Sequence, residues 1–346
     1  MVTMANAFVT RGYLVDLVLA SVQGPYLKNV APGVRVVDLK AGRVIRALLP
    51  LVSYLRRERP NALLSAMTHS NVIAICARIM SGVPTRLVVS ERSTISMDIR
   101  QAQGWASRFI YALVPKIYPL ADCIIAVSKG SAANLISYAS LPTNSVVVIY
   151  NPFELHHIQK RAMEAIHHPW FEPYQPPVVL SIGRLTEQKD FPCLIRAFVR
   201  LRGEGRHLKL LILGEGELRS SLEILVVECG LTAEDVQMPG FVSNPFAYLA
   251  RCATFVLSSR YEGLPGVLIE AMACGAPVVS TDCLSGPREI LEDGRWGALV
   301  PVGDEEAMAL AIAATLDSVN YPDVTERSLS FAEVTAVEKY LAALIQ

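Results

Sequence analysis

The sequence predicts an α/β protein with two domains, each built on a doubly wound parallel sheet. The chain has 346 residues, more than one typical core accommodates. Short β-branched and aliphatic runs alternate with helical patterns along its length, as in strand–helix–strand units. This alternation stops once, between Asn151 and Pro177, where five prolines and four histidines occur. We therefore expect the two domains to meet in this stretch.

The first half contains short runs typical of parallel strands. They are Tyr13–Leu19, Ala62–Leu64, Arg86–Val89, Cys123–Val127 and Val146–Ile149. Ala5–Val9 is typical of the end of a helix, and Arg11-Gly12 of its stop. Because no strand pattern precedes that helix, we expect the first strand of the N-terminal domain to be missing.

The second half repeats the same alternation and ends in a helix. Its predicted strands are Val178–Ile182, Leu208–Leu213, Thr254–Leu257, Pro277–Ser280 and Ala298–Val300. Apolar residues at helical spacing, among them Val334, Val337 and Tyr340, predict a final helix. The expected organisation is an N-terminal domain over residues 1–170, a C-terminal domain over 171–330, and a helix over 331–346 that packs back toward the N-terminal domain.

Composition excludes several classes of protein. With 52% hydrophobic and 18% charged residues, the chain should be packed rather than disordered. The seven cysteines are scattered without a C-x-x-C pair, so neither a disulfide framework nor a metal site is predicted. No apolar run is long enough to span a membrane, and no signal peptide pattern opens the chain. These features predict a cytoplasmic protein.

Charge is unevenly distributed. Residues 1–170 carry 18 Lys and Arg against 8 Asp and Glu, whereas residues 171–346 carry 14 against 24. A basic half suits an anionic partner, with acidic lipid or a lipid phosphate favoured over nucleic acid, which we do not predict as a partner. Peripheral contact with the inner face of the cytoplasmic membrane is one interpretation. Electrostatic attraction between two complementary domains is the other.

The segment Ser258–Gly275 joins a buried strand to a helix through a glycine turn. Pro265 suits a first helical position and Gly275 a stop, so a helix of about ten residues should begin at the carboxyl edge of the sheet. Ligands of α/β sheets bind at this edge. Glu262 in the turn and Glu270 in the helix could then reach different hydroxyl groups of one ligand. The alternative is that Glu262 only caps the helix and Glu270 is solvated.

A second segment, Ser181–Asp190, is a strand that ends in a glycine turn at Gly183. Arg184 and Lys189 follow, five residues apart. Both could close on a diphosphate, Arg184 as a fork and Lys189 as a point charge, and neutralise it as a leaving group. Taken alone, the two cations could equally be ordinary surface residues. Beside the first segment, they predict a phosphate site.

These segments resemble the donor domain of family 4 retaining glycosyltransferases of the GT-B fold. The matching motifs are Gly183-Arg184…Lys189, Gly214-Glu215-Gly216 and Glu262-x7-Glu270. Asp122–Ser128 and Ile149–Pro152 resemble the first domain of the same family. Ser280–Leu291 is similar to bacterial exopolysaccharide, capsule and O-antigen members. The resemblance covers nearly the whole chain and implies two Rossmann-like domains with an active site in the cleft between them.

The resemblance also implies roles for residues. Arg184 and Lys189 would bind the donor diphosphate, and Glu270 the ribose. Glu262 and the backbone of Gly263–Pro265 would bind the transferred sugar. Candidate catalytic residues are Glu262, Lys189 and Arg184, and the implied donor site consists of Gly183, Arg184, Lys189, Gly214, Glu262, Gly263, Leu264, Pro265, Val267, Leu268 and Glu270. The family is metal-independent and uses no cofactor, because the nucleotide sugar, here expected to be UDP-linked, is a co-substrate.

The acceptor side departs from the family pattern. Many relatives have a histidine after the fourth strand of the first domain, where this chain has Glu91-Arg92. Either residue could do related work on the acceptor side. His69 lies at a strand-to-helix junction, where an acceptor role and a structural role beside an N-cap at Ser70 or Thr68 are equally open.

Arg100–Lys116 interleaves cations with Trp105, Phe109 and Tyr111. Such a face could lie on an anionic bilayer, or the aromatic residues could be core and the cations solvated. As a whole, the sequence predicts retaining transfer of a sugar to a lipid-linked or polysaccharide acceptor in bacterial surface glycan synthesis. A catalytically silent sugar-nucleotide-binding or partner protein, or a GT-B epimerase, is the alternative.

Overall fold

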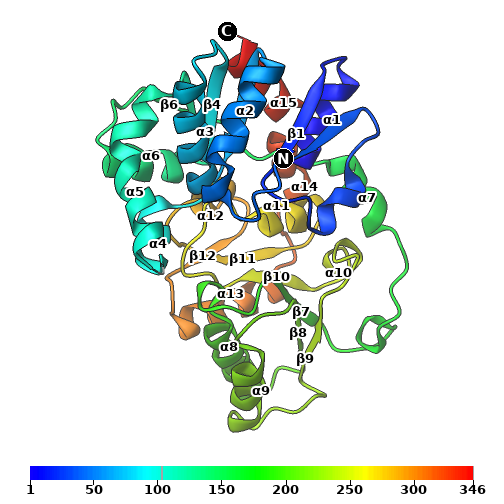
Figure 1. Ribbon diagram of the computed structural model, residues 1–346. Helices are drawn as coiled ribbons and strands as arrows, with labels where there is room; N and C mark the ends of the chain where they lie inside the picture. The colour runs from blue at the N-terminus through cyan, green and yellow to red at the C-terminus, as the bar shows by residue number, and fades with distance from the viewer. Residues whose placement is uncertain (103, 346) are drawn as a thin grey trace. The chain divides into compact units, whose positions relative to one another are not determined.

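The chain folds as two compact units (Figure 1). Its computed structural model describes residues 1–102 and 104–345, without the side chains of Pro25 and Tyr26. Unit 1 comprises Met1–Pro152 and Glu333–Gln346, and unit 2 comprises Phe153–Ala332. Gln346, the last residue of the predicted C-terminal helix, lies outside the described residues. The alternation of strands and helices confirms the predicted parallel α/β fold.

The strands of unit 1 form two separate parallel sheets. One pairs β1 with β2, and the other has the order β3-β4-β5-β6. The first described element is a helix, as the sequence predicts. The strands are β1 Val15–Leu19, β2 Val34–Asp38, β3 Ala62–Ala66, β4 Arg86–Glu91, β5 Cys123–Ala126 and β6 Val146–Val148.

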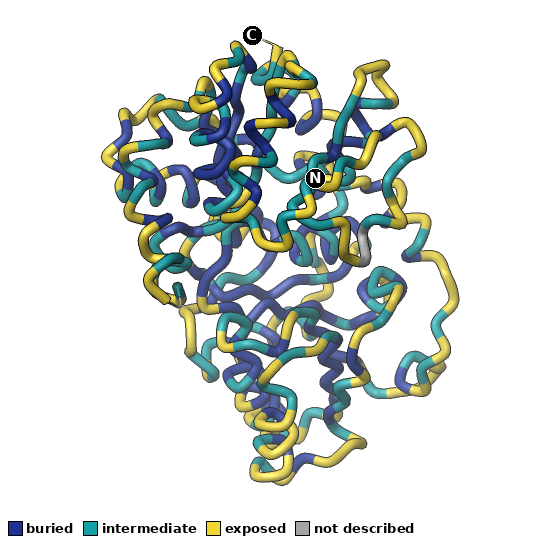
Figure 2. The backbone as a smooth tube through the Cα atoms, in the orientation of Figure 1, coloured by how far each residue is buried: buried dark blue, intermediate teal, exposed yellow. Residues whose placement is uncertain are grey.

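Helices cover these sheets and complete the core of unit 1, in which β4 and β5 are the mostly buried strands (Figure 2 shows burial along the backbone). A large core cluster joins α2, α3 and α5 to β4 and β5. The helices are α1 Val2–Thr10, α2 Leu48–Glu58, α3 Thr68–Ser81, α4 Ile95–Gln101, α5 Trp105–Ile117, α6 Lys129–Ala139 and α15 Glu333–Ile345, with short 3-10 helices η1 Pro25–Asn29, η2 Val44–Ala47 and η3 Tyr118–Leu120.

Unit 2 is built on one parallel sheet of six strands in the order β12-β11-β10-β7-β8-β9. Alternate residues of its central strands face opposite sides. Val179 and Val256 pack with α8 and α13 on one side, and Leu180 and Phe255 are buried on the other. The strands are β7 Val178–Ile182, β8 Lys209–Leu213, β9 Val236–Gly240, β10 Thr254–Leu257, β11 Val278–Thr281 and β12 Ala298–Val300.

Both faces of this sheet are covered, as in doubly wound folds. The helices of unit 2 are α7 Leu155–Ala162, α8 Phe191–Gly203, α9 Arg219–Glu228, α10 Phe246–Leu249, α11 Gly266–Ala273, α12 Pro287–Ile290, α13 Glu305–Asp317 and α14 Val324–Ser328, with 3-10 helices η4 Pro169–Phe171, η5 Glu187–Lys189 and η6 Leu329–Phe331. In the described part of the chain, no helix combines the length and apolarity needed to cross a bilayer.

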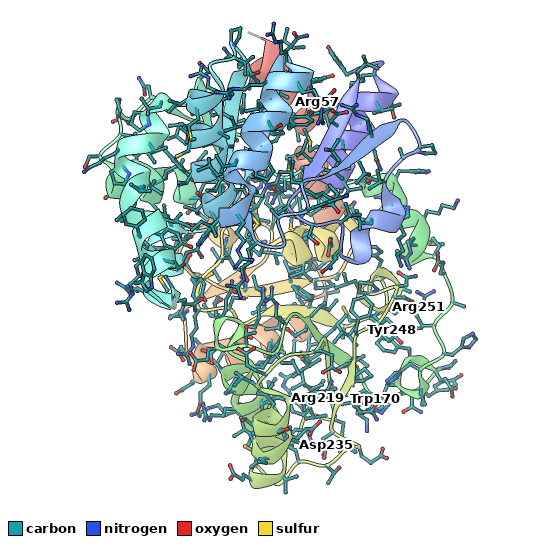
Figure 3. All side chains as sticks on the ribbon, viewed as in Figure 1. Arg57, Trp170, Arg219, Asp235, Tyr248 and Arg251 are labelled. Carbon is teal, nitrogen blue, oxygen red and sulfur yellow. The ribbon has the colours of Figure 1, made fainter. Side chains whose placement is uncertain are left out.

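The units divide after Pro152, and not at residue 170 as the proline-rich stretch predicts. Leu155 and Ile158 of α7 are buried in a cluster of unit 2, which ties this stretch to the second unit. Trp170 is also buried, and the guanidinium of Arg251 donates to the last carbonyl oxygen of α7 at 2.9 Å. Figure 3 labels Trp170 and Arg251. The segment is therefore part of unit 2 and not a solvated linker.

The last helix, α15, belongs to unit 1. It buries Ala336, Val337 and Tyr340 against α1 and the β4 strand, and the hydroxyl of Tyr340 lies 3.0 Å from that of Ser90. The apolar stripe predicted from helical spacing differs at Val334, which is exposed. The segment thus completes a core to which the chain's first helix also contributes.

Two strands, β2 and β9, are not predicted from the sequence. In β2 only Val34 is buried, so the strand has no strong apolar pattern. Strand β9 contains Pro239 and Gly240, which are typical of turns. Its position at the edge of the sheet explains why a proline is tolerated there.

Candidate functional site

The carboxyl ends of β7 and β10 lie where the strand order of unit 2 reverses. From β7 the sheet continues through β8 and β9 on one side, and through β10, β11 and β12 on the other. Open α/β sheets bind ligands outside the carboxyl ends of the strands at such a point. Lys189 lies in the loop after β7, and Glu262 in the loop after β10. The two strongest motifs of the sequence therefore meet at one place.

Lys189 and Glu262 form an ion pair, with Nζ 2.5 Å from Oε1. Their side chains are only 17% and 10% exposed. The hydroxyl of Ser259 donates to the same Oε1 at 2.7 Å. The sequence assigns Lys189 to phosphate and Glu262 to sugar, but here the two side chains neutralise each other. A diphosphate would have to replace the carboxylate as the partner of the ammonium group.

Hydrogen bonds tie the two loops together. The hydroxyl of Ser258 donates to the carbonyl oxygen of Lys189 at 2.6 Å. The backbone N–H of Arg260 donates to the carbonyl oxygen of Gln188 at 2.8 Å, and Gln188 Nε2 donates to the carbonyl oxygen of Tyr261 at 3.0 Å. These residues lie within the two motifs, but the sequence predicts no role for them. They fix the geometry of the Lys189–Glu262 pair.

Arg184, the second predicted phosphate ligand, is exposed. Among the ion pairs of the described residues it has none, so its guanidinium is available to an anion. Gly183 precedes it at the end of β7, where the methylenes of Lys189 pack over the backbone, and a Cβ there would lie 3.2 Å from three of them. The glycine turn therefore accommodates the lysine side chain.

Gly214, at the end of β8, touches the same turn. A Cβ at this position would lie 2.0 Å from the carbonyl oxygen of Gly183, and the φ angle of Gly214 is +141°. Its N–H donates to the carbonyl oxygen of Gly240 at 2.9 Å. Both the close approach and the backbone conformation require glycine here.

Replacing Gly214 with alanine should lower the free energy of unfolding by about 2–4 kcal/mol, because strain and overlap both add to the folded state. Urea denaturation measures this loss. Gly205→Ala is the matched control, since Gly205 also has positive φ, +83°, but no atom lies within 4 Å of its Cβ position. An equal loss in both variants would mean that the close approach at Gly214 does not exist.

Helix α11 follows the Glu262 turn. It is somewhat shorter than predicted, with Pro265 at the N-cap and Gly275 at φ +78° beyond its end. Glu270 is partly buried on this helix, and no described residue donates a hydrogen bond to its carboxylate. Desolvation raises the pKa of Glu270 to about 7. A carboxylate in this condition suits the hydroxyl groups of a ligand.

The other predicted donor residues differ in how far they are exposed to solvent. Gly263 and Val267 are partly exposed, whereas Leu264 and Pro265 are buried. Leu268 has no exposed surface in either its backbone or its side chain, so it belongs to the core and presents nothing to a nucleotide. An apolar residue on a helix can face either a ligand or the core, and the sequence alone does not decide which applies to Leu268.

Glu91 in unit 1 is enclosed at the end of β4, with 1% of its surface exposed. Its Oε2 accepts hydrogen bonds from the hydroxyls of Tyr118 at 2.8 Å and Thr68 at 3.0 Å. Desolvation raises the pKa of Glu91 to about 7. Because it is enclosed, Glu91 can position its neighbours but does not itself present a surface to an acceptor. Arg92 is partly exposed and has a buried Nε with no described partner.

His69 has structural partners within unit 1. Its Nε2 lies 3.1 Å from the hydroxyl of Ser107, and its ring packs edge-on against Tyr111 at a centroid distance of 5.3 Å. The predicted N-cap at Ser70 or Thr68 is wrong, because Met67 occupies the N-cap of α3 with φ +77°. The first residue of α3 donates its hydroxyl to the enclosed carboxylate after β4 instead.

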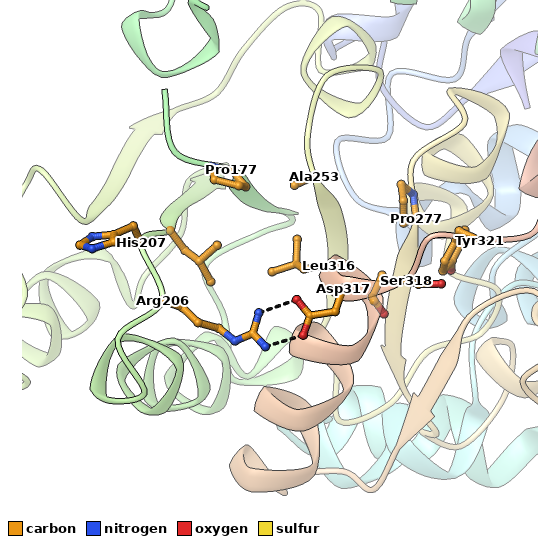
Figure 4. Close-up of a pocket in the computed structure, with 11 residues that line it drawn as sticks. Pro177, Arg206, His207, Ala253, Pro277, Leu316, Asp317, Ser318 and Tyr321 are labelled. Atoms are coloured by element: carbon orange, nitrogen blue, oxygen red, sulfur yellow. Dashed lines mark hydrogen bonds and ion pairs between the residues drawn. The ribbon is translucent and has the colours of Figure 1, made fainter. Parts of the chain in front are cut away.

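A cavity of about 420 Å³ lies at the opposite edge of the unit 2 sheet (Figure 4). Pro177, Ala253 and Pro277 line it, and each directly precedes a strand. Arg206 and Asp317 close one side with a two-pronged ion pair at 2.9 and 2.5 Å. None of the predicted donor residues that the structure describes lines this cavity. The ligand edge of the sheet is the better candidate for function.

Two family models match the chain. The model described as Glycosyltransferase Family 4 matches residues 1–157, and the model described as Glycosyl transferases group 1 matches residues 176–318. The second match contains every residue of the predicted donor site. The first contains His69, Glu91 and Arg92.

Individual proteins agree with these models. The chain is 37% identical over 251 residues to an N-acetylgalactosamine-N,N'-diacetylbacillosaminyl-diphospho-undecaprenol 4-alpha-N-acetylgalactosaminyltransferase of Campylobacter jejuni, covering 72% of this chain and 66% of that protein. It is 40% identical over 140 residues to the lipopolysaccharide core biosynthesis glycosyltransferase LpsE of Rhizobium meliloti, covering 40% and 39%. The chain spans less than two thirds of the length of either relative.

Solved structures show the same fold. The crystal structure of Anabaena HepE in complex with UDP-glucose superimposes with a TM-score of 0.80 at 18% identity, covering 99% of this chain and 94% of that chain. At this identity the likeness concerns the fold, which is the two-domain GT-B architecture expected from the sequence.

Proposed function

Because the chain belongs to the glycosyltransferases of group 1 and family 4, we propose that it transfers a sugar from a nucleotide-diphosphate donor to a lipid-linked or polysaccharide acceptor in bacterial surface glycan synthesis. The donor we propose is a UDP-sugar. The observation that carries the proposal is the arrangement of Lys189, Glu262 and Glu270 at the strand-order reversal of unit 2.

Each of these residues offers chemistry that a nucleotide sugar needs. The ammonium of Lys189 and the exposed guanidinium of Arg184 suit the two phosphates. The desolvated carboxylate of Glu270 suits the ribose hydroxyls, because both of its oxygens lack donors among the described residues. Glu262 suits sugar hydroxyls once a phosphate takes its place beside Lys189. The Lys189–Glu262 ion pair is then the neutral form of the site without ligand, and donor binding breaks this pair.

The proposed reaction retains configuration and needs no metal. The bond between the anomeric carbon and the diphosphate oxygen breaks while Lys189 and Arg184 neutralise the departing charge. The acceptor oxygen forms its bond to the anomeric carbon on the same face, and its proton passes to a phosphate oxygen of the leaving group. Activity that survives EDTA, and a product of the same anomeric configuration as the donor, are the expected results.

The acceptor we propose is lipid-linked. The Campylobacter relative carries diphospho-undecaprenol in its name. Unit 1 has 17 Lys and Arg against 8 Asp and Glu, which favours an anionic acceptor. In unit 1, Glu91 is a positioning residue rather than an acceptor contact, because it holds Thr68 and Tyr118 from an enclosed position. Its neighbour Arg92 is the better candidate for direct contact.

Calorimetric titration tests the donor site directly. UDP and UDP-sugars should bind to the wild-type chain, and GDP more weakly. Glu270→Ala and Lys189→Ala should both weaken binding of UDP. Glu228→Gln, an exposed acidic residue of α9, should leave it unchanged. Absence of binding to any nucleotide would contradict the proposed function, and equal affinity in all variants would place the nucleotide elsewhere.

A further inference from the structure

Helix α5 has two different faces. Ile110, Tyr111 and Val114 are buried in the core of unit 1. Trp105 is 83% exposed and Phe109 58%, although both are large aromatic residues. The sequence leaves open whether the aromatic residues of this segment are core or surface. The structure separates them, with Tyr111 inside and Trp105 and Phe109 outside.

The exposed residues of α5 fall on one stripe. Trp105, Phe109, Ala112 and Lys116 follow one another at intervals of four, three and four residues, which keeps them on the same side of a helix, and Arg108 lies beside them. All five are exposed. We call these five residues the α5 surface. Single exposed aromatic residues are ordinary, but two on one stripe with flanking cations need an explanation.

The opposite side of α5 already fixes the helix in the fold. It packs against α3 and α6, and the hydroxyl of Tyr138 donates to the carbonyl oxygen of Tyr111 at 3.1 Å. The edge-on contact of Tyr111 with His69 adds to this packing. The α5 surface therefore has no part in holding α5 in place, and its two aromatic side chains are available to an external partner.

The charge along the segment that carries the α5 surface has one sign. No Asp or Glu occurs between Asp98 and Asp122, whereas Arg100, Arg108 and Lys116 fall in that interval. None of these three cations forms an ion pair with any residue that the structure describes. The flanking acids are engaged elsewhere, since Asp98 accepts a hydrogen bond from a serine hydroxyl and Asp122 is paired with an arginine. The surface is therefore cationic as well as aromatic.

We propose that the α5 surface docks unit 1 on an anionic lipid bilayer. Trp105 and Phe109 would enter the headgroup region, where amphipathic rings are stable, and Arg108 and Lys116 would contact lipid phosphates. The proposal rests on the proposed function only in that a lipid-linked acceptor gives docking a purpose. Binding itself requires neither donor nor acceptor.

Helix α9 of unit 2 provides a matched control surface. Ile224 and Val227 are 59% and 73% exposed, which is a comparable display of apolar side chains. Glu223 and Glu228 lie beside them and are also exposed. Apolar attraction alone would act on both helices, whereas an anionic bilayer should attract α5 and repel α9.

The protein carries its own spectroscopic reporter for this test. Of its three tryptophans, Trp170 and Trp296 are 6% and 8% exposed, so Trp105 alone is freely accessible. Phosphatidylglycerol-containing vesicles should shift the tryptophan emission of the full chain to shorter wavelength and co-sediment with it at low salt. Pure phosphatidylcholine vesicles should do neither. Added salt should weaken binding, because the attraction is electrostatic at long range.

Variants localise the binding. Trp105→Ala with Phe109→Ala should lower the partition coefficient at least about tenfold, and Arg108→Glu with Lys116→Glu by more than about tenfold, since each basic residue near an anionic surface contributes about fivefold. Ile224→Ala with Val227→Ala should bind like wild type. Trp105→Phe should keep most binding and lose the emission shift.

Three outcomes would overturn the docking surface. The first is that the wild-type chain fails to bind anionic vesicles at low salt. The second is that both α5 double variants bind as well as the wild-type chain. The third is an emission shift that depends on protein concentration and occurs without vesicles, which would make the surface a contact between copies of the chain. Calorimetry with UDP on the same variants separates this result from the proposed function. Vesicle binding without UDP binding refutes the donor site and leaves the docking surface standing, and the reverse result refutes the docking surface alone.

Discussion

Lys189→Ala should lower the turnover number roughly 10²–10³-fold, the effect of removing one preorganised charge from a developing anion. The side chain of Lys189 is 17% exposed, and the loops after β7 and β10 hold it, so its charge is preorganised. Its substitution also removes the ammonium group that contacts the Glu262 carboxylate, while the hydroxyl of Ser259 remains. Steady-state kinetics with a UDP-sugar donor measures the loss.

The control for this prediction is Lys209→Ala. Lys209 is a partly buried lysine of the same unit, but it begins β8 at the opposite edge of the sheet and lies over the ring of Trp170 at 5.3 Å. Its substitution should leave turnover unchanged. Near-normal rates in Lys189→Ala would show that the leaving group is neutralised elsewhere.

Stability has to be separated from chemistry in this experiment. Breaking a partly buried ion pair destabilises a protein because one charge remains without its partner. Glu262→Gln added to Lys189→Ala should restore the melting temperature, since the amide carries no charge. Turnover should stay low. If turnover recovered together with stability, the negative charge of Glu262 would have caused the loss and Lys189 would have no role at the phosphates.

The sequence predicts most of this site because each half of it is local. The strand, the glycine turn and Lys189 lie within twelve residues, and Glu262 lies four residues before the start of α11. The ion pair itself could not be predicted. Lys189 and Glu262 are 73 residues apart, and they meet only because β10 inserts beside β7 instead of beside β9, its predecessor in the chain.

The same distinction explains the errors. The boundary after Pro152 depends on where Leu155 and Ile158 of α7 are buried. A short amphipathic pattern predicts a helix but not the unit against which that helix packs. Leu268 has the same apolar character as a nucleotide contact, yet it faces the core. The two outward aromatic residues of α5 are likewise indistinguishable from Tyr111 by composition alone. Local sequence patterns predict helices and strands, whereas the direction in which a side chain faces depends on tertiary packing.

Glu270→Ala should weaken the affinity for UDP roughly 10²-fold, the value of charge-assisted hydrogen bonds between a carboxylate and two hydroxyl groups. Calorimetry measures this loss at pH 8, where the carboxylate is ionised. The pKa of Glu270 is raised to about 7 by burial, and the ionised carboxylate accepts stronger hydrogen bonds from the ribose hydroxyls than the protonated carboxyl does. Wild-type affinity should therefore fall as the pH drops below 7, and the affinity of the alanine variant should fall less, because only the terminal phosphate of UDP then takes up a proton.

Ionisation of Glu270 should have the opposite effect on the stability of the fold from its effect on UDP affinity. A carboxyl group whose folded pKa lies above its unfolded value of 4.5 contributes stability below pH 4.5, and that contribution is lost as the pH rises through 7. Glu270→Gln removes the ionisable group, so at pH 8 it should raise the free energy of unfolding by about 1–3 kcal/mol. Near pH 4 the variant and the wild-type chain should be equally stable. Urea denaturation at the two pH values tests this.

The combination of the two effects distinguishes a binding residue from a structural one. A carboxylate that served the fold would be hydrogen-bonded within the protein, and its replacement would lower stability at pH 8. Glu270 has no described donor, so the folded protein bears the cost of its desolvation, and a ligand hydroxyl is the partner that offsets it. A glutamine variant that loses stability at pH 8, or keeps full affinity for UDP, would contradict this assignment.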